Sequence, residues 1–208
     1  MQCRAFQVFL QYPKMNNYFT LLPELPRVPD WIVGSFDLNS RPDNSALRLH
    51  AKPENWQQQD YKWIVPTNDV HHGRRLFEPE VMQWLTENIS DNYNKKNAGW
   101  VFFDRQFPPH CDVTRDWVLL YNLQVGGPDA EICFYQQKDH DIINVRGVEI
   151  EDTDELDELV RIPGPPLHTW YLINSQVVHG VRNQTETRIN LQLGFEIGVT
   201  PNILKEKK

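Results

Sequence analysis

The chain has 208 residues, 40% of them hydrophobic and 12% aromatic, and its 28 acidic and 21 basic side chains give a net charge of -7. This length fits one domain, or one domain with an extension, and argues against a fusion of two enzymes, while the aromatic content argues against a disordered chain. The negative charge excludes the general electrostatic attraction that drives binding to nucleic acids or anionic membranes.

Three cysteines, Cys3, Cys111 and Cys133, are widely spaced and form no C-x-x-C pair. Such a set fits neither a disulfide framework nor a thiolate zinc site, and it favours a reducing compartment. The first residues contain only a short apolar run without a small-residue cleavage site, and the sequence has no run of about 20 apolar residues. We therefore expect a cytoplasmic protein without nucleic-acid or membrane partners. The sequence does not indicate its oligomeric state.

Residues 1–97 are predicted to form an N-terminal extension packed on the core of the fold. Residues 1–77 are rich in Pro, Asn and Trp, which predicts irregular structure with a few short strands. Within this part, Arg74 and Arg75 follow the polar stretch TNDVHHG, where a solvated turn is expected. Contact with an anionic substrate is the alternative for these two arginines.

Residues 78–93 are predicted to form one amphipathic helix. The apolar side chains recur near helical spacing, and Pro79 suits the first turn, where a missing backbone N–H costs nothing. The apolar positions are Val81, Trp84, Leu85 and Ile89. We expect this helix to pack on the core.

Residues 98–200 are predicted to form the core, followed by a tail at 201–208. The rhythm changes to short strand-like runs separated by turn signals, which favours an antiparallel sandwich or barrel of jelly-roll type. A polar insert interrupts the strands between residues 137 and 161, and its acidic stretch spans 149–158. A solvated loop or short surface helix is expected there, with a lid over the substrate as the alternative.

The segment FPPHCDV, residues 107–113, carries the first candidate site. Alternate side chains of a strand lie on the same face, so His110 and Asp112 project together and Cys111 points away. An imidazole and a carboxylate side by side can occupy two adjacent positions around a metal ion. A third ligand from elsewhere would leave positions open for substrate and oxygen.

The candidate for that third ligand is His179. If residues 183–186 form a hairpin loop, His179 pairs with Asn190 and shares a face with Arg188. A guanidinium binds a carboxylate through two parallel hydrogen bonds, so this arrangement suits a small diacid between metal and Arg188. Alternation also predicts an apolar face opposite the polar face of Arg188, Asn190 and Gln192. Its members are Ile189, Leu191, Leu193 and Phe195.

The order His110-x-Asp112, then His179, then Arg188-x-Asn190 resembles the iron(II)- and 2-oxoglutarate-dependent dioxygenase superfamily. The family signature is H-x-D, a distal His and an Arg-x-Ser-type pair, and Asn190 stands here in the place of the Ser. The resemblance covers about residues 98–198 and implies a double-stranded β-helix of the jelly-roll, cupin-like type.

The resemblance implies that His110, Asp112 and His179 bind Fe(II), and that Arg188, aided by Asn190, holds the distal carboxylate of 2-oxoglutarate. Oxidative decarboxylation of 2-oxoglutarate with O2 would then give succinate and carbon dioxide, with hydroxylation of the substrate as the default outcome. Tyr121 and Asn122 are further candidates for co-substrate contact. Because neighbouring residues of a strand face opposite sides, only one of them can face inward.

The substrate class stays open between a peptidyl side chain, with prolyl and aspartyl or asparaginyl hydroxylation as the first types to test, and a small metabolite. Two functions of other classes remain. One is a non-catalytic jelly-roll ligand-binding module, in which the H-x-D pair and the distal His are merely buried. The other is a cupin-like metal enzyme that does not use 2-oxoglutarate. Arg115 and Asp116, which follow the H-x-D segment, are a candidate ion pair.

Overall fold

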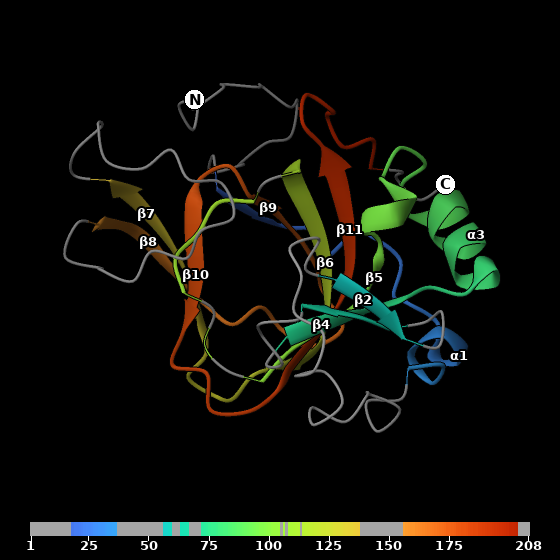
Figure 1. The fold of residues 1–208 in the computed structure, drawn as a ribbon, viewed down its shortest axis with the longest axis horizontal. Helices are drawn as coiled ribbons and strands as arrows, with labels where there is room; N and C mark the ends of the chain where they lie inside the picture. The colour runs from blue at the N-terminus through green and yellow to red at the C-terminus, as the bar shows by residue number, and fades with distance from the viewer. Residues whose placement is uncertain are drawn as a thin grey trace.

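The computed structural model describes residues 18–36, 56–59, 63–66, 72–104, 106, 108–112, 114–137 and 156–203. These residues form a mainly β structure with two antiparallel sheets (Figure 1). The end of the acidic insert is described from residue 156, whereas residues 149–155 and the tail from residue 204 lie outside the described residues.

The larger sheet has eight strands in the order β1-β9-β6-β11-β5-β4-β3-β2. The first four in chain order come from the N-terminal part, and the other four come from the part after residue 98. The strands are β1 (Phe19–Leu21), β2 (Trp56–Gln59), β3 (Trp63–Pro66), β4 (His72–Leu76), β5 (Gly99–Phe103), β6 (Arg115–Val125), β9 (Trp170–Asn174) and β11 (Arg188–Glu196).

The smaller sheet has the order β10-β7-β8, formed by β7 (Glu131–Gln137), β8 (Leu156–Pro163) and β10 (Val178–Arg182). A short fourth segment joins its free side through an antiparallel bridge between His110 and His179. The smaller sheet therefore presents four extended segments, and β10 lies between the H-x-D segment and β7.

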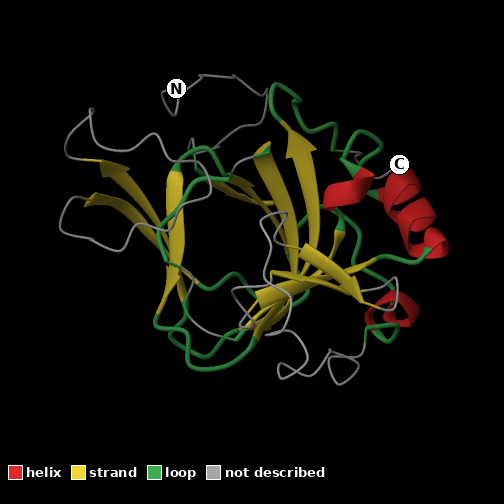
Figure 2. Cartoon of the chain, viewed as in Figure 1, coloured by secondary structure: helices red, strands yellow, loops and turns green. Residues whose placement is uncertain are grey.

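The helices cover the face of the large sheet that is turned away from the small sheet (Figure 2). They are α1 (Asp30–Val33), α3 (Pro79–Asn88) and the 3-10 helix η2 (Lys95–Asn97). Helix α3 confirms the predicted amphipathic helix, with Pro79 in its first turn and Val81 and Leu85 buried, but it ends at Asn88 and not at residue 93. No helix in the described ranges is long and apolar enough to cross a membrane.

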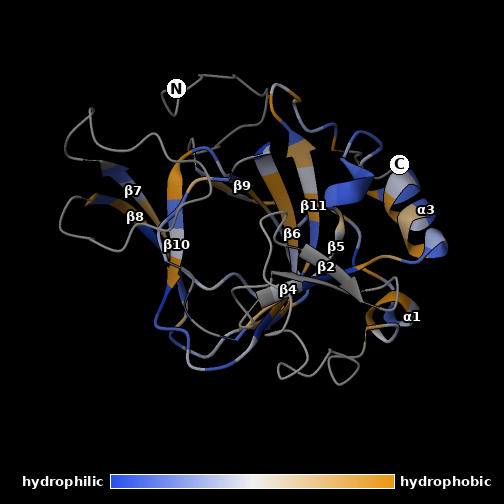
Figure 3. Ribbon diagram, viewed as in Figure 1, coloured by the Kyte–Doolittle hydropathy of each residue, from blue (hydrophilic) through white to orange (hydrophobic). Residues whose placement is uncertain are grey.

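Two hydrophobic clusters lie on the two faces of the large sheet. The first packs the helices on the sheet and includes Leu85, Trp100 and Leu193. The second lies between the two sheets and comprises Phe19, Val118, Leu120, Ile132, Phe134, Tyr171 and Ile173. Both faces of the central strands β6 and β11 are therefore covered, and hydrophobic residues run along both strands in Figure 3.

The faces of β11 follow the predicted alternation. Leu191, Leu193 and Phe195 belong to the cluster under the helices. Arg188 and Asn190 are buried on the opposite face, toward the small sheet. The polar face of this strand thus lines the space between the two sheets, which we call the inter-sheet space.

The predicted hairpin at residues 183–186 is wrong. Strand β10 pairs with β7, whereas β11 pairs with β5 and β6, so the two strands belong to different sheets. Gln184 anchors the crossing connection, because it is buried and its Nε2 donates to the backbone oxygens of Phe103 and Glu186. The backbone N–H groups of Thr185 and Glu186 also donate to the Gly126 oxygen.

Two other local predictions are wrong. Residues 156–161, expected in a loop or short helix, belong to β8, whose Asp157, Glu158 and Arg161 are exposed. A strand with charged, exposed side chains lacks the apolar alternation by which strands are recognised. Arg74 and Arg75, expected in a solvated turn, belong to β4 and point to opposite faces of the large sheet.

The role of Gln184 in the crossover gives a testable prediction. Replacing Gln184 with Ala removes the donor for two backbone oxygens, which we expect to cost about 1–3 kcal/mol of unfolding free energy. The nearby exposed Glu186→Ala should change it by less than about 0.5 kcal/mol. Urea unfolding of both variants measures the difference. Equal stability of the two variants would contradict the tethering of the crossover.

Candidate metal centre

The H-x-D segment lies beside β10 because two backbone hydrogen bonds join them. The N–H of His110 donates to the His179 oxygen, and the N–H of His179 donates to the His110 oxygen, each at 2.9 Å. The two imidazole rings consequently lie close together, with their centroids 4.4 Å apart. Cys111 points to the other side of the small sheet and contacts Cys133, Tyr135 and their neighbours, as alternation predicts.

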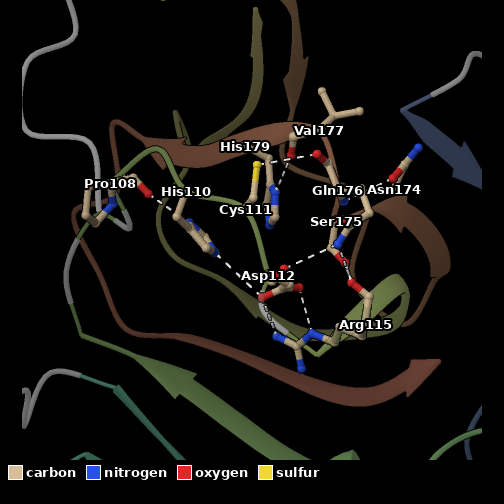
Figure 4. Close-up of polar contacts among 10 residues, drawn as sticks. All are labelled: Pro108, His110, Cys111, Asp112, Arg115, Asn174, Ser175, Gln176, Val177 and His179. Atoms are coloured by element: carbon tan, nitrogen blue, oxygen red, sulfur yellow. Dashed lines mark hydrogen bonds and ion pairs between the residues drawn. The ribbon is translucent and has the colours of Figure 1, made fainter. Parts of the chain in front are cut away.

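Each histidine is held in one orientation by a backbone carbonyl. Nδ1 of His110 lies 2.9 Å from the Pro108 oxygen, and Nδ1 of His179 lies 2.9 Å from the Val177 oxygen (Figure 4). Since a carbonyl oxygen only accepts, each Nδ1 must carry the hydrogen. In the neutral ring this leaves a lone pair on Nε2, which is the arrangement of metal-binding histidines.

Both histidines are neutral at physiological pH. Burial, followed by the nearby His179 ring, lowers the pKa of His110 to about 3. Burial also lowers the pKa of His179, and the charges of Arg115 and Arg188 act in the same direction. A lone pair on Nε2 is therefore available to a metal without prior loss of a proton.

Asp112 completes the predicted ligand set and is held by Arg115. The Arg115 guanidinium makes a two-pronged contact, with Nε 2.6 Å from Oδ2 and Nη2 2.9 Å from Oδ1. Burial disfavours the charged carboxylate, but the charge and hydrogen bonds of Arg115 hold the pKa of Asp112 below its ordinary value. The expected pairing of Arg115 with Asp116 is wrong, because Asp116 instead accepts from the Gly198 N–H.

The turn between β9 and β10 holds the backbone of both members of the Asp112–Arg115 ion pair. The Asp112 N–H donates to the Ser175 oxygen. The Ser175 hydroxyl and the Gln176 amide both donate to the backbone oxygen of Arg115, at 3.1 and 2.8 Å. In Figure 4 the two imidazoles approach the carboxylate from one side and the Arg115 guanidinium from the other.

Arg188 approaches the same space from the large sheet. Its side chain is 7% exposed, lies over the Phe103 ring at 5.9 Å, and donates from Nη2 to the Tyr171 hydroxyl at 2.9 Å. The Tyr171 hydroxyl donates onward to Oδ1 of Asn190 at 3.3 Å. No carboxylate of the described residues lies within ion-pair distance of Arg188, although buried charges are normally paired.

Asn122 lies directly opposite Asn190 on the neighbouring strand β6. Its Nδ2 donates to the Pro165 oxygen, but its Oδ1 and the Nδ2 of Asn190 are buried without a hydrogen-bond partner. Tyr121 faces the other way and packs with Trp170 under the helices. The structure thus brings Asn122 to the inter-sheet space and leaves Tyr121 outside it.

The distances between the donor atoms of His110, His179 and Asp112 determine whether these side chains can bind one metal ion without moving. His110 Nε2 lies 4.0 Å from Asp112 Oδ1, whereas adjacent ligands of one metal ion are roughly 3 Å apart. Accordingly, no group of three or more His, Cys, Asp or Glu side chains in the described ranges meets the geometry of a metal site as it stands. The donor types fit a metal, and a carboxylate shift of about 1 Å would bring the first pair to that spacing.

Comparison of the chain with protein-family models, curated protein sequences and solved structures found no match.

Sequence reasoning missed two residues that contact the predicted site residues. Tyr171 links Arg188 to Asn190, and Arg115 holds Asp112. Alternation along WYLIN shows that Trp170 and Tyr171 face opposite sides, but it cannot choose which one faces inward. The Arg115 contact could be anticipated from its spacing of three residues after Asp112, a common distance for local ion pairs.

The neutral histidines give a prediction for pH. A folded pKa below the unfolded value of about 6.5 means that the unfolded chain binds more protons below this pH. The metal-free protein should therefore lose stability as the pH falls below about 6.5, by up to ~1.4 kcal/mol per pH unit for each histidine. Urea unfolding between about pH 7.5 and pH 5 measures this slope.

Variants show which side chains cause this change of unfolding free energy with pH. His110→Asn and His179→Asn should each remove part of the change. His168→Asn is the matched control, because His168 is exposed and its positive φ of 56° is a conformation that Asn tolerates. A slope that survives both ligand substitutions, or that disappears in His168→Asn, would contradict neutral burial of the pair.

Proposed function

We propose that the chain is an Fe(II)- and 2-oxoglutarate-dependent oxygenase that hydroxylates a peptidyl side chain, of prolyl or aspartyl/asparaginyl type, or a small metabolite. One observation carries the proposal. Two neutral histidines, each oriented by a backbone carbonyl at Nδ1, and a carboxylate lie on one side of the inter-sheet space. A buried arginine without a described acidic partner lies on the other side.

The strand arrangement supports a double-stranded β-helix of the jelly-roll type. A jelly roll has eight strands in two sheets. Four strands of the large sheet, β5, β11, β6 and β9, are consecutive neighbours, and they face the H-x-D segment, β10, β7 and β8 of the small sheet. The remaining four strands, β1 to β4, extend the large sheet at its two edges.

The metal would be held by Nε2 of His110, Nε2 of His179 and one oxygen of Asp112. Each carboxylate oxygen has two lone pairs, so the contact with Arg115 leaves one on each oxygen for a metal. Two histidines and one carboxylate leave open coordination positions, as in non-haem Fe(II) oxygenases. Bound Fe(II) would supply the reaction in which O2 oxidatively decarboxylates 2-oxoglutarate to succinate and carbon dioxide and hydroxylates the substrate.

The distal carboxylate of 2-oxoglutarate would be held by Arg188 and Asn190. Arg188 keeps several N–H donors beyond the one that Tyr171 uses, and Nδ2 of Asn190 is a buried donor without a partner. A carboxylate accepts from both and neutralises the buried charge of Arg188. Tyr171 would fix the orientation of both groups, and Oδ1 of Asn122 could accept from a bound water or from the substrate.

The protein would hold the metal ligands in fixed positions and limit the access of water to them. The carbonyls of Pro108 and Val177 keep both imidazoles in one orientation, and Arg115 keeps Asp112 ionised. The hydrophobic cluster between the sheets, with Phe134 next to His179 at 6.2 Å between rings, limits water behind the ligands. These features favour the same placement in every turnover.

One observation favours a non-catalytic binding module instead. The Asp112 carboxylate already has a two-pronged arginine partner, so its burial needs no metal. The neutral histidine pair is harder to explain in that way, because two largely buried imidazoles and a carboxylate on one face are the donor types of a metal site. A metal enzyme that does not use 2-oxoglutarate would leave the buried Arg188 unexplained.

Thermal melting of the metal-free protein under anaerobic conditions tests the proposal. We expect Mn(II) or Fe(II) to raise the melting temperature, and 2-oxoglutarate to raise it further only when metal is present, because ligands that bind the folded state stabilise it. His110→Ala, Asp112→Ala and His179→Ala should lose the metal response. Arg188→Ala should lose mainly the 2-oxoglutarate part.

The exposed Arg161→Ala is the matched control and should respond like the wild type. A wild-type protein that binds metal but never responds to 2-oxoglutarate would favour the metal enzyme without this co-substrate. A wild type that responds to neither would favour the non-catalytic module.

Arg115→Lys tests the support of the carboxylate. Lysine keeps the positive charge but cannot make the two-pronged contact, so Asp112 loses its fixed orientation. We expect the affinity for Mn(II) to fall by about 10- to 100-fold, the usual effect of residues that orient metal ligands. Calorimetric titration measures it, and unchanged affinity would show that the ion pair serves stability alone.

A further inference from the structure

We propose that Asn122 and Asn190 together bind a carboxamide group of the primary substrate, which makes an asparaginyl side chain the preferred substrate class. The identity of this ligand as the substrate rests on the proposed function. The sequence alone offers both residues only as contacts of the co-substrate. Four observations point to a contact with the substrate as well.

The first observation is that both amides are completely buried and only half satisfied. Each side chain lies on the face of the large sheet that lines the inter-sheet space, with no exposed surface. Among the residues that the structure describes, Oδ1 of Asn122 and Nδ2 of Asn190 have no hydrogen-bond partner. Oδ1 is an acceptor, whereas Nδ2 carries two donor hydrogens. Buried polar groups are normally hydrogen-bonded, so these atoms await a partner from outside the chain.

The second observation is that the protein fixes which half of each amide is presented. Nδ2 of Asn122 donates to the Pro165 oxygen, so turning this amide over would set its oxygen against another acceptor. Oδ1 of Asn190 accepts from the Tyr171 hydroxyl, whose oxygen in turn accepts from Arg188. Asn122 therefore presents an acceptor, and Asn190 presents a donor.

The third observation is the register, which sets the two amides directly opposite each other on β6 and β11. The Cβ atoms of such a pair are roughly 5 Å apart. The donor and the acceptor are therefore neighbours, yet they do not bind each other. A primary carboxamide is complementary to both, because its NH2 group donates to Asn122 and its oxygen accepts from Asn190. The second hydrogen on Nδ2 of Asn190 remains for the distal carboxylate of 2-oxoglutarate.

The chemistry of the acceptor excludes the other candidate ligands. The carboxylates and the keto oxygen of 2-oxoglutarate only accept hydrogen bonds, so the co-substrate cannot satisfy Oδ1 of Asn122. The ionised side chain of an aspartyl residue and the ring of a prolyl residue have no donor either. An ammonium group would be repelled by the charge of Arg188, two residues from Asn190 on the same face. Of the three peptidyl types in the proposed function, the asparaginyl side chain alone fits both amides.

The fourth observation is the position of Asn122 relative to a metal ligand. Leu120, two residues earlier on the same face of β6, belongs to the hydrophobic cluster between the sheets together with Phe134. The Phe134 ring lies 6.2 Å from the His179 ring. A substrate side chain held by Asn122 would therefore have this cluster beside its apolar carbons, and the cluster extends to the metal centre.

Anaerobic melting of the full chain, loaded with Mn(II) and saturating 2-oxoglutarate, tests the proposal. All probes share one blocked backbone, with an N-acetyl and a dimethylamide group, and differ only in the side chain. The side chains are those of asparagine, aspartate, serine and 4-oxonorvaline, in which a methyl group replaces the NH2 of asparagine. We expect the asparagine probe to raise the melting temperature saturably, with at least about tenfold higher affinity than the other three.

Variants of Asn122 connect this response to the site. Asn122→Leu should bind the asparagine probe at least about tenfold more weakly, because it lacks the acceptor. It should still respond to 2-oxoglutarate, since Arg188 and Asn190 are unchanged. Asn122→Asp keeps an acceptor oxygen and should retain more of the response than Asn122→Leu. Gln136→Leu makes the same exchange at an exposed position of β7 and should respond like the wild type.

The proposal is overturned if the asparagine probe does not stabilise the wild type, if any other probe stabilises it equally, or if Asn122→Leu keeps the full response. Equal binding of the serine probe would show that the two amides hold a hydroxyl group instead. If Asn122→Leu does not fold, the asparagine and 4-oxonorvaline probes on the wild type still decide.

Failure of the proposed function is seen separately, as the lack of a response to Mn(II) and 2-oxoglutarate. In that case the same titrations on the metal-free protein decide whether Asn122 and Asn190 form a carboxamide site.

Discussion

Two reciprocal backbone hydrogen bonds between His110 and His179 join the H-x-D segment to the small sheet. This short bridge determines the rest of the site. It places both imidazoles on the same face, and the next alternate residue, Asp112, follows on that face at the end of the segment. The carbonyls that orient the rings lie two residues before each histidine, so the same extended backbone supplies both the ligands and their supports.

The polar residues of the inter-sheet space lie where most strands would have apolar ones. Every residue of β11 except the last is buried, so Arg188, Asn190 and Gln192 lose contact with water without leaving the sheet. Buried polar groups are costly unless they are satisfied. Tyr171 satisfies part of this demand by joining Arg188 to Asn190. Oδ1 of Asn122 and Nδ2 of Asn190 have no hydrogen-bond partner, and both residues face the inter-sheet space, where they would stabilise a polar ligand.

The sequence predicted the structure best where the feature depends on one strand alone, namely on which face of the strand each side chain lies. Alternation alone separated His110 from Cys111, and the apolar face of β11 from its polar face. It failed where the partner came from far along the chain. The connection at 183–186 has the composition of a hairpin, but Gln184 binds the end of β5, which no local pattern encodes. The position of Arg74 depends on Gly99, a residue of the neighbouring strand.

The position of β11 has a consequence for how the protein folds. It is the last strand of the described chain, yet it lies in the middle of the large sheet between β5 and β6. During synthesis, the earlier strands on its two sides cannot be joined into one sheet until β11 emerges. Contacts between residues so distant in sequence slow folding and leave strand edges exposed in the meantime. The strand that carries Arg188 therefore also completes the sheet, so that assembly of the inter-sheet space coincides with the end of folding.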